Sequence, residues 1–168
     1  MLVQLAPNAT PCPDEQGRSS AEGRPRLRVE PWPDPVIDEV GHDPRSVYVE
    51  TFWLPILGPS ATWLLRHFMI RLDESPGGIE LDIEDTARSL GLGERLSHNS
   101  PFARTIKRCV DFEMAKWRGP RVLATRVRLP PLPRRHARRL PAPLQARYRD
   151  NQNTQVLSLL SEQTKDLP

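Results

Sequence analysis

The spacing of apolar residues predicts a helical centre followed by a β-hairpin. Over residues 59–72 the apolar side chains recur every three or four positions, which is typical of a helix with one buried face. A second run of this kind covers residues 100–112. The period then changes to two over residues 112–117 and 121–129, on either side of a turn at 118–120. This alternation predicts two antiparallel strands.

Shorter elements lie between and before these runs. Residues 78–82 alternate as a short strand would, and Asp82 is a good N-cap for a helix over 83–90. Gly91 and Gly93 end that helix, because glycine tolerates the left-handed turn at a helix end. Residues 94–99 form a polar connector. The aromatic segment 47–57 predicts one short helix interrupted by its proline.

Both ends of the chain are rich in proline and poor in periodic apolar residues. Of the 19 prolines, most fall before residue 60 or between residues 120 and 143. We therefore predict a disordered Pro-rich acidic tail over 1–45, a folded domain over 46–130, and a basic Pro/Arg-rich extension with a weak C-terminal helix over 131–168. We predict a fold that is mainly α with a small β-hairpin.

Charge is divided unevenly along the chain. Residues 1–99 contain 9 Lys and Arg against 16 Asp and Glu, whereas residues 100–150 contain 14 against 3. The first part is thus net −7 and the second net +11. Such segregation indicates a half that faces a polyanion. Arginine outnumbers lysine 21 to 3, which also fits a GC-rich coding bias, so distribution is the better evidence.

Other patterns limit the classes of function. The two cysteines differ in context and suggest free thiols in a reducing compartment. No apolar run is long enough to cross a membrane and no secretory leader is visible, so we expect a cytoplasmic, nucleoid-associated protein. The four histidines are isolated from other metal ligands, and no phosphate-binding loop is complete. We expect no cofactor, no metal and no enzymatic activity.

Two segments resemble a known family. Phe52 to Leu65 (FWLPILGPSATWLL) resembles a signature of winged helix-turn-helix domains in bacterial primosomal and plasmid or phage replication proteins, with Pro55, Gly58 and Ala61 at its fixed points. Leu81 to Gly93 is similar to the first helix of the DNA-binding helix pair. The chain departs from the family at the turn, where about six residues replace the usual three. The resemblance implies a winged helix over about 47–130 and a role in transcription regulation or replication.

The predicted second helix carries the candidate DNA contacts. With Ile106 facing inward, Arg104 and Arg108 fall almost opposite, as a ridge that would enter the major groove. Ser100 caps this helix and leaves N–H groups for a phosphate. The hairpin would contact the DNA backbone as a basic wing. The candidate nucleic-acid-binding residues are Ser100, Arg104, Thr105, Lys107, Arg108, Arg118, Arg121, Arg126, Arg128, Arg134 and Arg135.

The expected partner is double-stranded DNA, together with a polymerase or replication protein. Two alternatives stay open at this stage. One is a winged-helix module that docks on a larger protein machine through its aromatic segment and acidic tail. The other is RNA or ribosome binding through the arginine-rich stretch. Homodimerisation through the C-terminal helix is a further hypothesis, and no membrane association is expected.

Overall fold

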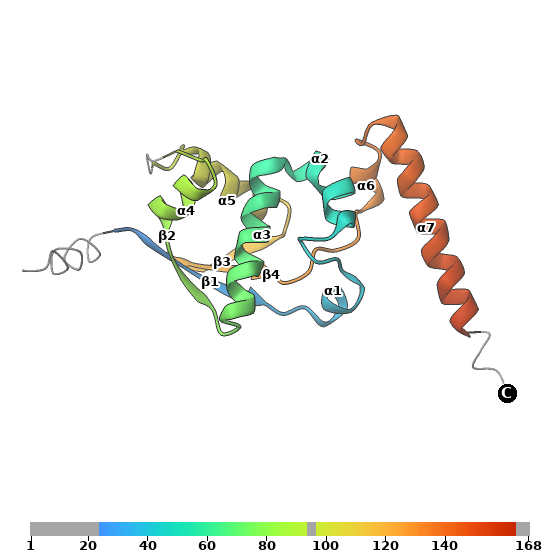
Figure 1. Cartoon of the computed structure of the whole chain (residues 1–168), viewed down its shortest axis with the longest axis horizontal. Helices are drawn as coiled ribbons and strands as arrows, with labels where there is room; N and C mark the ends of the chain where they lie inside the picture. The colour runs from blue at the N-terminus through green and yellow to red at the C-terminus, as the bar shows by residue number, and fades with distance from the viewer. Residues whose placement is uncertain (1–23, 94–96, 164–168) are drawn as a thin grey trace, which may run out of the picture.

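The computed structural model describes residues 24–93 and 97–163, with side chains described as far as residue 154. Helices pack mainly on one face of a four-stranded sheet, and the long last helix projects to one side (Figure 1). The strands are β1 (Arg26–Trp32), β2 (Ile79–Asp82), β3 (Ala115–Gly119) and β4 (Val122–Arg126). The helices are α1 (Pro35–Val40), the π-helical turn η1 (Val49–Trp53), α2 (Leu54–Leu57), α3 (Pro59–Glu74), α4 (Ile83–Ser89), α5 (Pro101–Asp111), α6 (Arg134–Ala137) and α7 (Ala142–Gln163).

The sheet has the order β2-β1-β4-β3. Strand β1 pairs antiparallel with β2 and parallel with β4, so that Val29 lies beside both Ile79 and Leu123. Strands β3 and β4 form the predicted antiparallel hairpin, with Ala115 opposite Thr125. The fold is therefore mixed α/β, with a larger sheet than the small hairpin expected from the sequence.

Strand β1 corrects the prediction of a disordered tail up to residue 45. Leu27 and Val29 are buried while Arg26, Arg28 and Glu30 are wholly or partly exposed, which is the period of two that a half-buried strand needs. The run was overlooked because it is short and is followed by two prolines. Residues 1–23, the rest of the predicted tail, lie outside the described residues.

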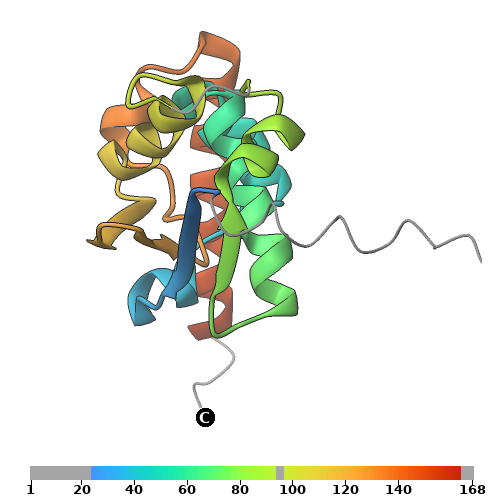
Figure 2. The same cartoon turned by 90° about the vertical axis from the view of Figure 1, so that its left-hand side faces the viewer.

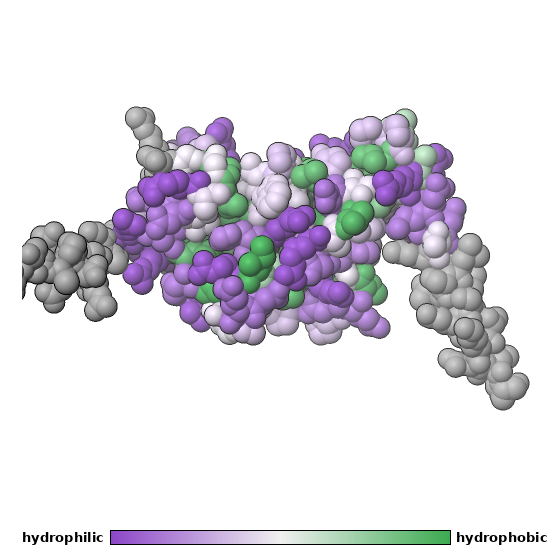
Figure 3. All heavy atoms as spheres, in the orientation of Figure 1, coloured by the Kyte–Doolittle hydropathy of each residue, from purple (hydrophilic) through white to green (hydrophobic). Residues whose placement is uncertain are grey.

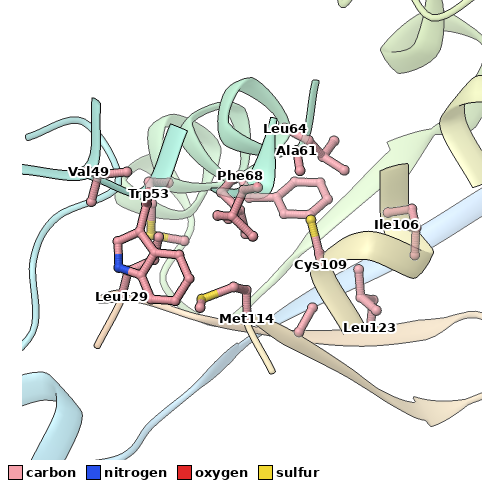
Figure 4. Close-up of a cluster of buried hydrophobic side chains, with 14 of the residues drawn as sticks. Val49, Trp53, Ala61, Leu64, Phe68, Ile106, Cys109, Met114, Leu123 and Leu129 are labelled. Carbon is pink, nitrogen blue, oxygen red and sulfur yellow. The ribbon is translucent and has the colours of Figure 1, made fainter. Parts of the chain in front are cut away.

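The core lies between the sheet and helices α3 and α5 (Figure 4). Ala61, Leu64 and Phe68 of α3 meet Ile106 and Cys109 of α5, as the helical spacing predicted. Met114, Leu123 and Leu129 close the cluster from the hairpin side. The predicted caps also form: the Asp82 carboxylate accepts from the Asp85 N–H, and Gly91 and Gly93 adopt positive φ.

The aromatic segment before α3 is continuous helix with one widened turn. Pro55 has no N–H to donate, and the π-helical turn η1 directly precedes it, where the helix leaves its regular hydrogen-bond pattern. Gly58 then turns the chain at φ 80° into α3. The Trp53 side chain of η1 is buried in the core, where its indole N–H donates to the Pro130 carbonyl at 2.8 Å.

The chain after residue 130 is part of the same core. Leu132 is fully buried; its N–H donates to the Tyr48 hydroxyl, and its carbonyl accepts from the Tyr148 hydroxyl at 2.6 Å. The Tyr148 ring packs edge-on against Phe52. The predicted boundaries at residues 46 and 130 therefore do not separate independent units, because residues from 27 to 148 share one hydrophobic cluster.

Candidate nucleic-acid interface

Two of the residues predicted to contact DNA on α5 face into the protein. The Ser100 hydroxyl accepts from the Ala103 N–H at 3.2 Å and is the N-cap of the helix, as predicted. Ser100 and Thr105 are both buried, and the Thr105 hydroxyl donates to the Pro101 carbonyl at 2.8 Å. Neither side chain is available to a duplex, so Thr105 is removed from the candidate contacts and Ser100 keeps only its capping role.

Arg108 lies on the exposed side of α5 but is held by contacts within the protein. Its guanidinium donates to the carbonyls of Ile56 and Leu57 at the end of α2 and lies 5.3 Å from the centroid of the Phe112 ring. Those carbonyls have no partner inside their own short helix, so the arginine completes the helix end. Both arginines of the predicted ridge are therefore exposed, but Arg108 already donates its hydrogen bonds to the protein, and its contact with DNA stays a prediction.

Arg104 and Lys107 remain on the solvent side of α5. Arg104 is exposed, and its side chain makes no hydrogen bond or ion pair with any described residue. Lys107 is exposed but forms an ion pair with Asp111 at 2.7 Å, one turn further along. Arg104 is thus the available arginine of this helix, and Lys107 would have to exchange its carboxylate for a phosphate.

The hairpin tip carries accessible positive charge next to an aromatic side chain. Arg118 and Arg121 are exposed on either side of the turn, and neither has a side-chain partner among the described residues. Trp117, immediately before them in β3, is 49% exposed. An exposed indole beside unpaired arginines is a combination found on nucleic-acid-binding surfaces.

The two arginines at the base of the hairpin are buried or half-buried. Arg126 is only 9% exposed; it donates to the Asp34 carboxylate at 2.6 Å and to the Glu113 carbonyl at 2.8 Å, and it lies over the Trp32 ring. Arg128 is half-buried and donates to the Asp38 carbonyl. Both tie the hairpin to the segment around α1, so Arg126 is removed from the candidate contacts and Arg128 is at most a partial one.

Helix α6 extends the basic surface from α5. The His136 ring contacts both Phe112, just after α5, and Trp53 of η1, so α6 lies beside the carboxyl end of α5. Arg134 and Arg135 are exposed on its first turn. Figure 2 shows α5 and the hairpin on one side of the molecule and α3 on the other.

Four accessible arginines after α6 were not among the predicted contacts. They are exposed, and their side chains form no hydrogen bond or ion pair with described residues. The available signal was the charge count of residues 100–150, but the segment had been assigned to a flexible extension. These arginines are Arg138, Arg139, Arg147 and Arg149.

Ion pairing differs between the described arginines of the first and second halves of the chain. Six arginines before residue 90 pair with carboxylates: Arg24, Arg28, Arg45, Arg66, Arg71 and Arg88. Eight arginines after residue 100 have no hydrogen bond or ion pair through their side chains among the described residues: Arg104, Arg118, Arg121, Arg134, Arg138, Arg139, Arg147 and Arg149. Among the described residues, these unpaired arginines lie on α5, the hairpin tip, α6 and the segment that follows it, and α7.

The titratable groups with shifted pKa values are structural. Burial lowers the pKa values of His42 and His67. The His42 ring stacks on the Tyr48 ring, with 3.5 Å between the ring centroids. The Cys109 thiol is fully buried, and desolvation raises its pKa to about 12. In the described part of the chain, no group of three histidine, cysteine or acidic side chains is arranged to hold a metal ion.

Comparison of this chain with protein-family models, curated proteins and solved structures gives no match. Within residues 24–93 and 97–163, no helix combines the length and apolar character needed to span a bilayer. On the face drawn in Figure 3, hydrophobic residues appear as small separate areas among hydrophilic ones. The interpretation of the site therefore depends on its own geometry and charge.

Proposed function

We propose that the protein binds double-stranded nucleic acid, and DNA in preference to RNA, through α5, the tip of the β3–β4 hairpin and α6. The observation that carries the proposal is the separation of paired and unpaired arginines. An arginine held by a carboxylate must give up that partner to meet a phosphate, whereas an unpaired one only releases the solvent and counterions around it.

The order of elements supports the same proposal. Residues 59–126 run helix, strand, helix, helix and hairpin, which is the order of the winged helix-turn-helix domains that segments 52–65 and 81–93 resemble. We propose that this part of the chain is a winged-helix variant in which the N-terminal strand β1 is inserted between the usual first strand and the wing. Arg104 would then approach the major groove, and Arg118 and Arg121 the adjacent backbone.

A salt titration tests the proposal. Anisotropy of a labelled 20-base-pair duplex would be measured with the full chain from 50 to 200 mM salt. Contacts with about six phosphates predict a loss of roughly a thousandfold in affinity across this range. An affinity independent of salt, or no binding at 50 mM, would refute the proposal. Duplex RNA of the same sequence is the competitor, and tighter binding of RNA would overturn the preference for DNA.

A matched pair of variants locates the interface. Arg118→Gln with Arg121→Gln removes two unpaired arginines, and Arg24→Gln with Arg71→Gln removes two paired ones for the same change in net charge. We expect the hairpin variant to reduce the slope of log affinity against log salt by about 1.8, and the control to leave it nearly unchanged. Equal effects of the two variants would indicate a diffuse charge effect and overturn this interface.

The biological process would follow from where the protein lies on its genome. Crosslinking in the host that gives discrete peaks would support a transcriptional regulator. Co-purification with a polymerase or replisome, without peaks, would instead support a replication-associated factor.

A further inference from the structure

A basic hollow lies between α6 and α7, outside the elements that the winged-helix resemblance covers. Its volume is about 440 Å³, and Arg134 and Arg138 reach it from α6 and the turn that follows, while Arg149 reaches it from α7. The Tyr148 ring forms part of its wall. Three arginines, two from α6 and the turn that follows and one from α7, therefore line one space.

The two sides of the hollow are fixed relative to each other by three hydrogen bonds. The Tyr148 hydroxyl donates to the Leu132 carbonyl at 2.6 Å, which anchors the start of α7 on the core. The Gln145 side-chain amide donates to the carbonyls of Leu140 and Arg138, which joins α7 to the end of α6. The elements that carry the arginines are therefore fixed before any ligand arrives, so that only the arginine side chains have to be ordered on binding.

The lining chemistry selects an anion with several oxygen atoms. None of the three arginines has a hydrogen-bonding side-chain partner among the described residues, and none of the described residues that line the hollow carries a carboxylate. The amides of Gln152 and Asn153 supply further donors at its rim. Guanidinium groups bind phosphate through two parallel hydrogen bonds each, and three of them can share the oxygens of one phosphate.

We propose that this hollow binds a phosphate group. This inference rests on the function proposed above. The phosphate then belongs to the backbone of a bound nucleic acid, beyond the part of the duplex that α5 and the hairpin tip contact. A free phosphate-bearing molecule would satisfy the same side chains, and the experiment distinguishes the two sources.

The test uses two double variants of the full chain. Arg138→Gln with Arg149→Gln removes two arginines of the hollow. Arg139→Gln with Arg147→Gln removes two unpaired arginines from the same segment that do not line it. Binding of pyrophosphate would be measured by calorimetry in a phosphate-free buffer, and binding of the 20-base-pair duplex by anisotropy. Thermal unfolding of both variants checks that the fold is kept.

We expect the unaltered chain to bind pyrophosphate at one site. The affinity for pyrophosphate should fall at least about tenfold in the hollow variant and less than about threefold in the control. If the slope of log affinity for the duplex against log salt falls by about one to two only in the hollow variant, the phosphate comes from the nucleic-acid backbone. Lost pyrophosphate binding with unchanged duplex binding overturns that source and supports a free molecule. No pyrophosphate binding, or equal loss in both variants, overturns the hollow itself. Pyrophosphate binding without any duplex binding leaves the hollow standing and refutes the proposed function.

Discussion

Arg126 provides the sharpest test of the arrangement around the hairpin. The sequence suggested a DNA contact, whereas its guanidinium donates to the Asp34 carboxylate and the Glu113 carbonyl and lies 3.9 Å from the centroid of the Trp32 ring. Removing it leaves the Glu113 carbonyl without this donor and the link between the hairpin and α1 broken. We therefore expect Arg126→Ala to destabilise the fold rather than to weaken nucleic-acid binding selectively.

The magnitude follows from the burial of Arg126. Its side chain is 11% exposed, and hydrogen bonds involving a charged group contribute about 1.5–3 kcal/mol each when they are well shielded. The carboxylate side of the pair is 27% exposed, so water can take over part of that bond. We expect a loss of about 3 kcal/mol in the free energy of unfolding for Arg126→Ala. For a domain of this size, this corresponds to a fall of roughly 10 °C in melting temperature.

Urea unfolding followed by tryptophan fluorescence measures this loss directly. The control is Arg121→Ala in the same hairpin, where an exposed side chain without a partner should change stability by no more than about 0.5 kcal/mol. Arg126→Met separates packing over Trp32 from hydrogen bonding and should recover part of the loss. Arg126→Ala and Arg121→Ala variants of equal stability would refute the structural role of Arg126.

The acid dependence of Arg126→Ala gives a second readout. The Arg126 guanidinium holds the pKa of Asp34 below its usual value, with a further contribution from the Ile37 N–H. A carboxyl with a lowered folded pKa stabilises the protein at a pH above its unfolded pKa, and that contribution is lost as the pH falls through the folded value. Between neutral pH and pH 3, the unaltered chain should therefore lose more stability than Arg126→Ala.

Three further predictions concern groups that contact other parts of the fold. Arg108→Ala should lower the free energy of unfolding by about 2 kcal/mol because it leaves two carbonyls of α2 without donors, whereas Arg104→Ala should change it by no more than about 0.5 kcal/mol; urea unfolding of both variants decides. Burial lowers the pKa of His42, so its contribution to stability is complete above the unfolded pKa near 6.5 and declines on acidification below it; a His42→Phe variant should show a smaller fall in melting temperature between pH 7.5 and pH 5.5. The Cys109 thiol, with its raised pKa of about 12, should resist a thiol reagent in the folded protein and react on unfolding in a variant that lacks the other cysteine; fast labelling under native conditions would contradict its burial.

Local patterns in the sequence determined most of the regular structure. The three- and four-residue spacing of apolar side chains predicted α3 and α5, and the alternation after residue 112 predicted the hairpin. Ser100 and Asp82 cap the helices that they were expected to begin. These features could be predicted because each depends on neighbours within about four residues, so their physical cause is contained in a short segment.

The role of each arginine was decided by the tertiary structure. Arg104 and Arg108 look alike on a helical projection, but only Arg108 donates to the carbonyls at the end of α2. Arg126 is drawn inward by Asp34, which is 92 residues away in the sequence. A long flexible side chain takes whichever partner the fold brings near, so the accessibility of a charge is a property of the packed chain.

The membership of the sheet and the basic hollow also depended on long-range packing. Strand β1 has the alternation of a strand, but its place between β2 and β4 depends on residues 50 to 100 positions away. The hollow depends on Tyr148 reaching the Leu132 carbonyl, which brings α7 against the core. The sequence alone determined that the second half of the chain is strongly basic; only the fold decided which of its arginines are left to meet a phosphate, because the same charges also serve as internal hydrogen-bond donors.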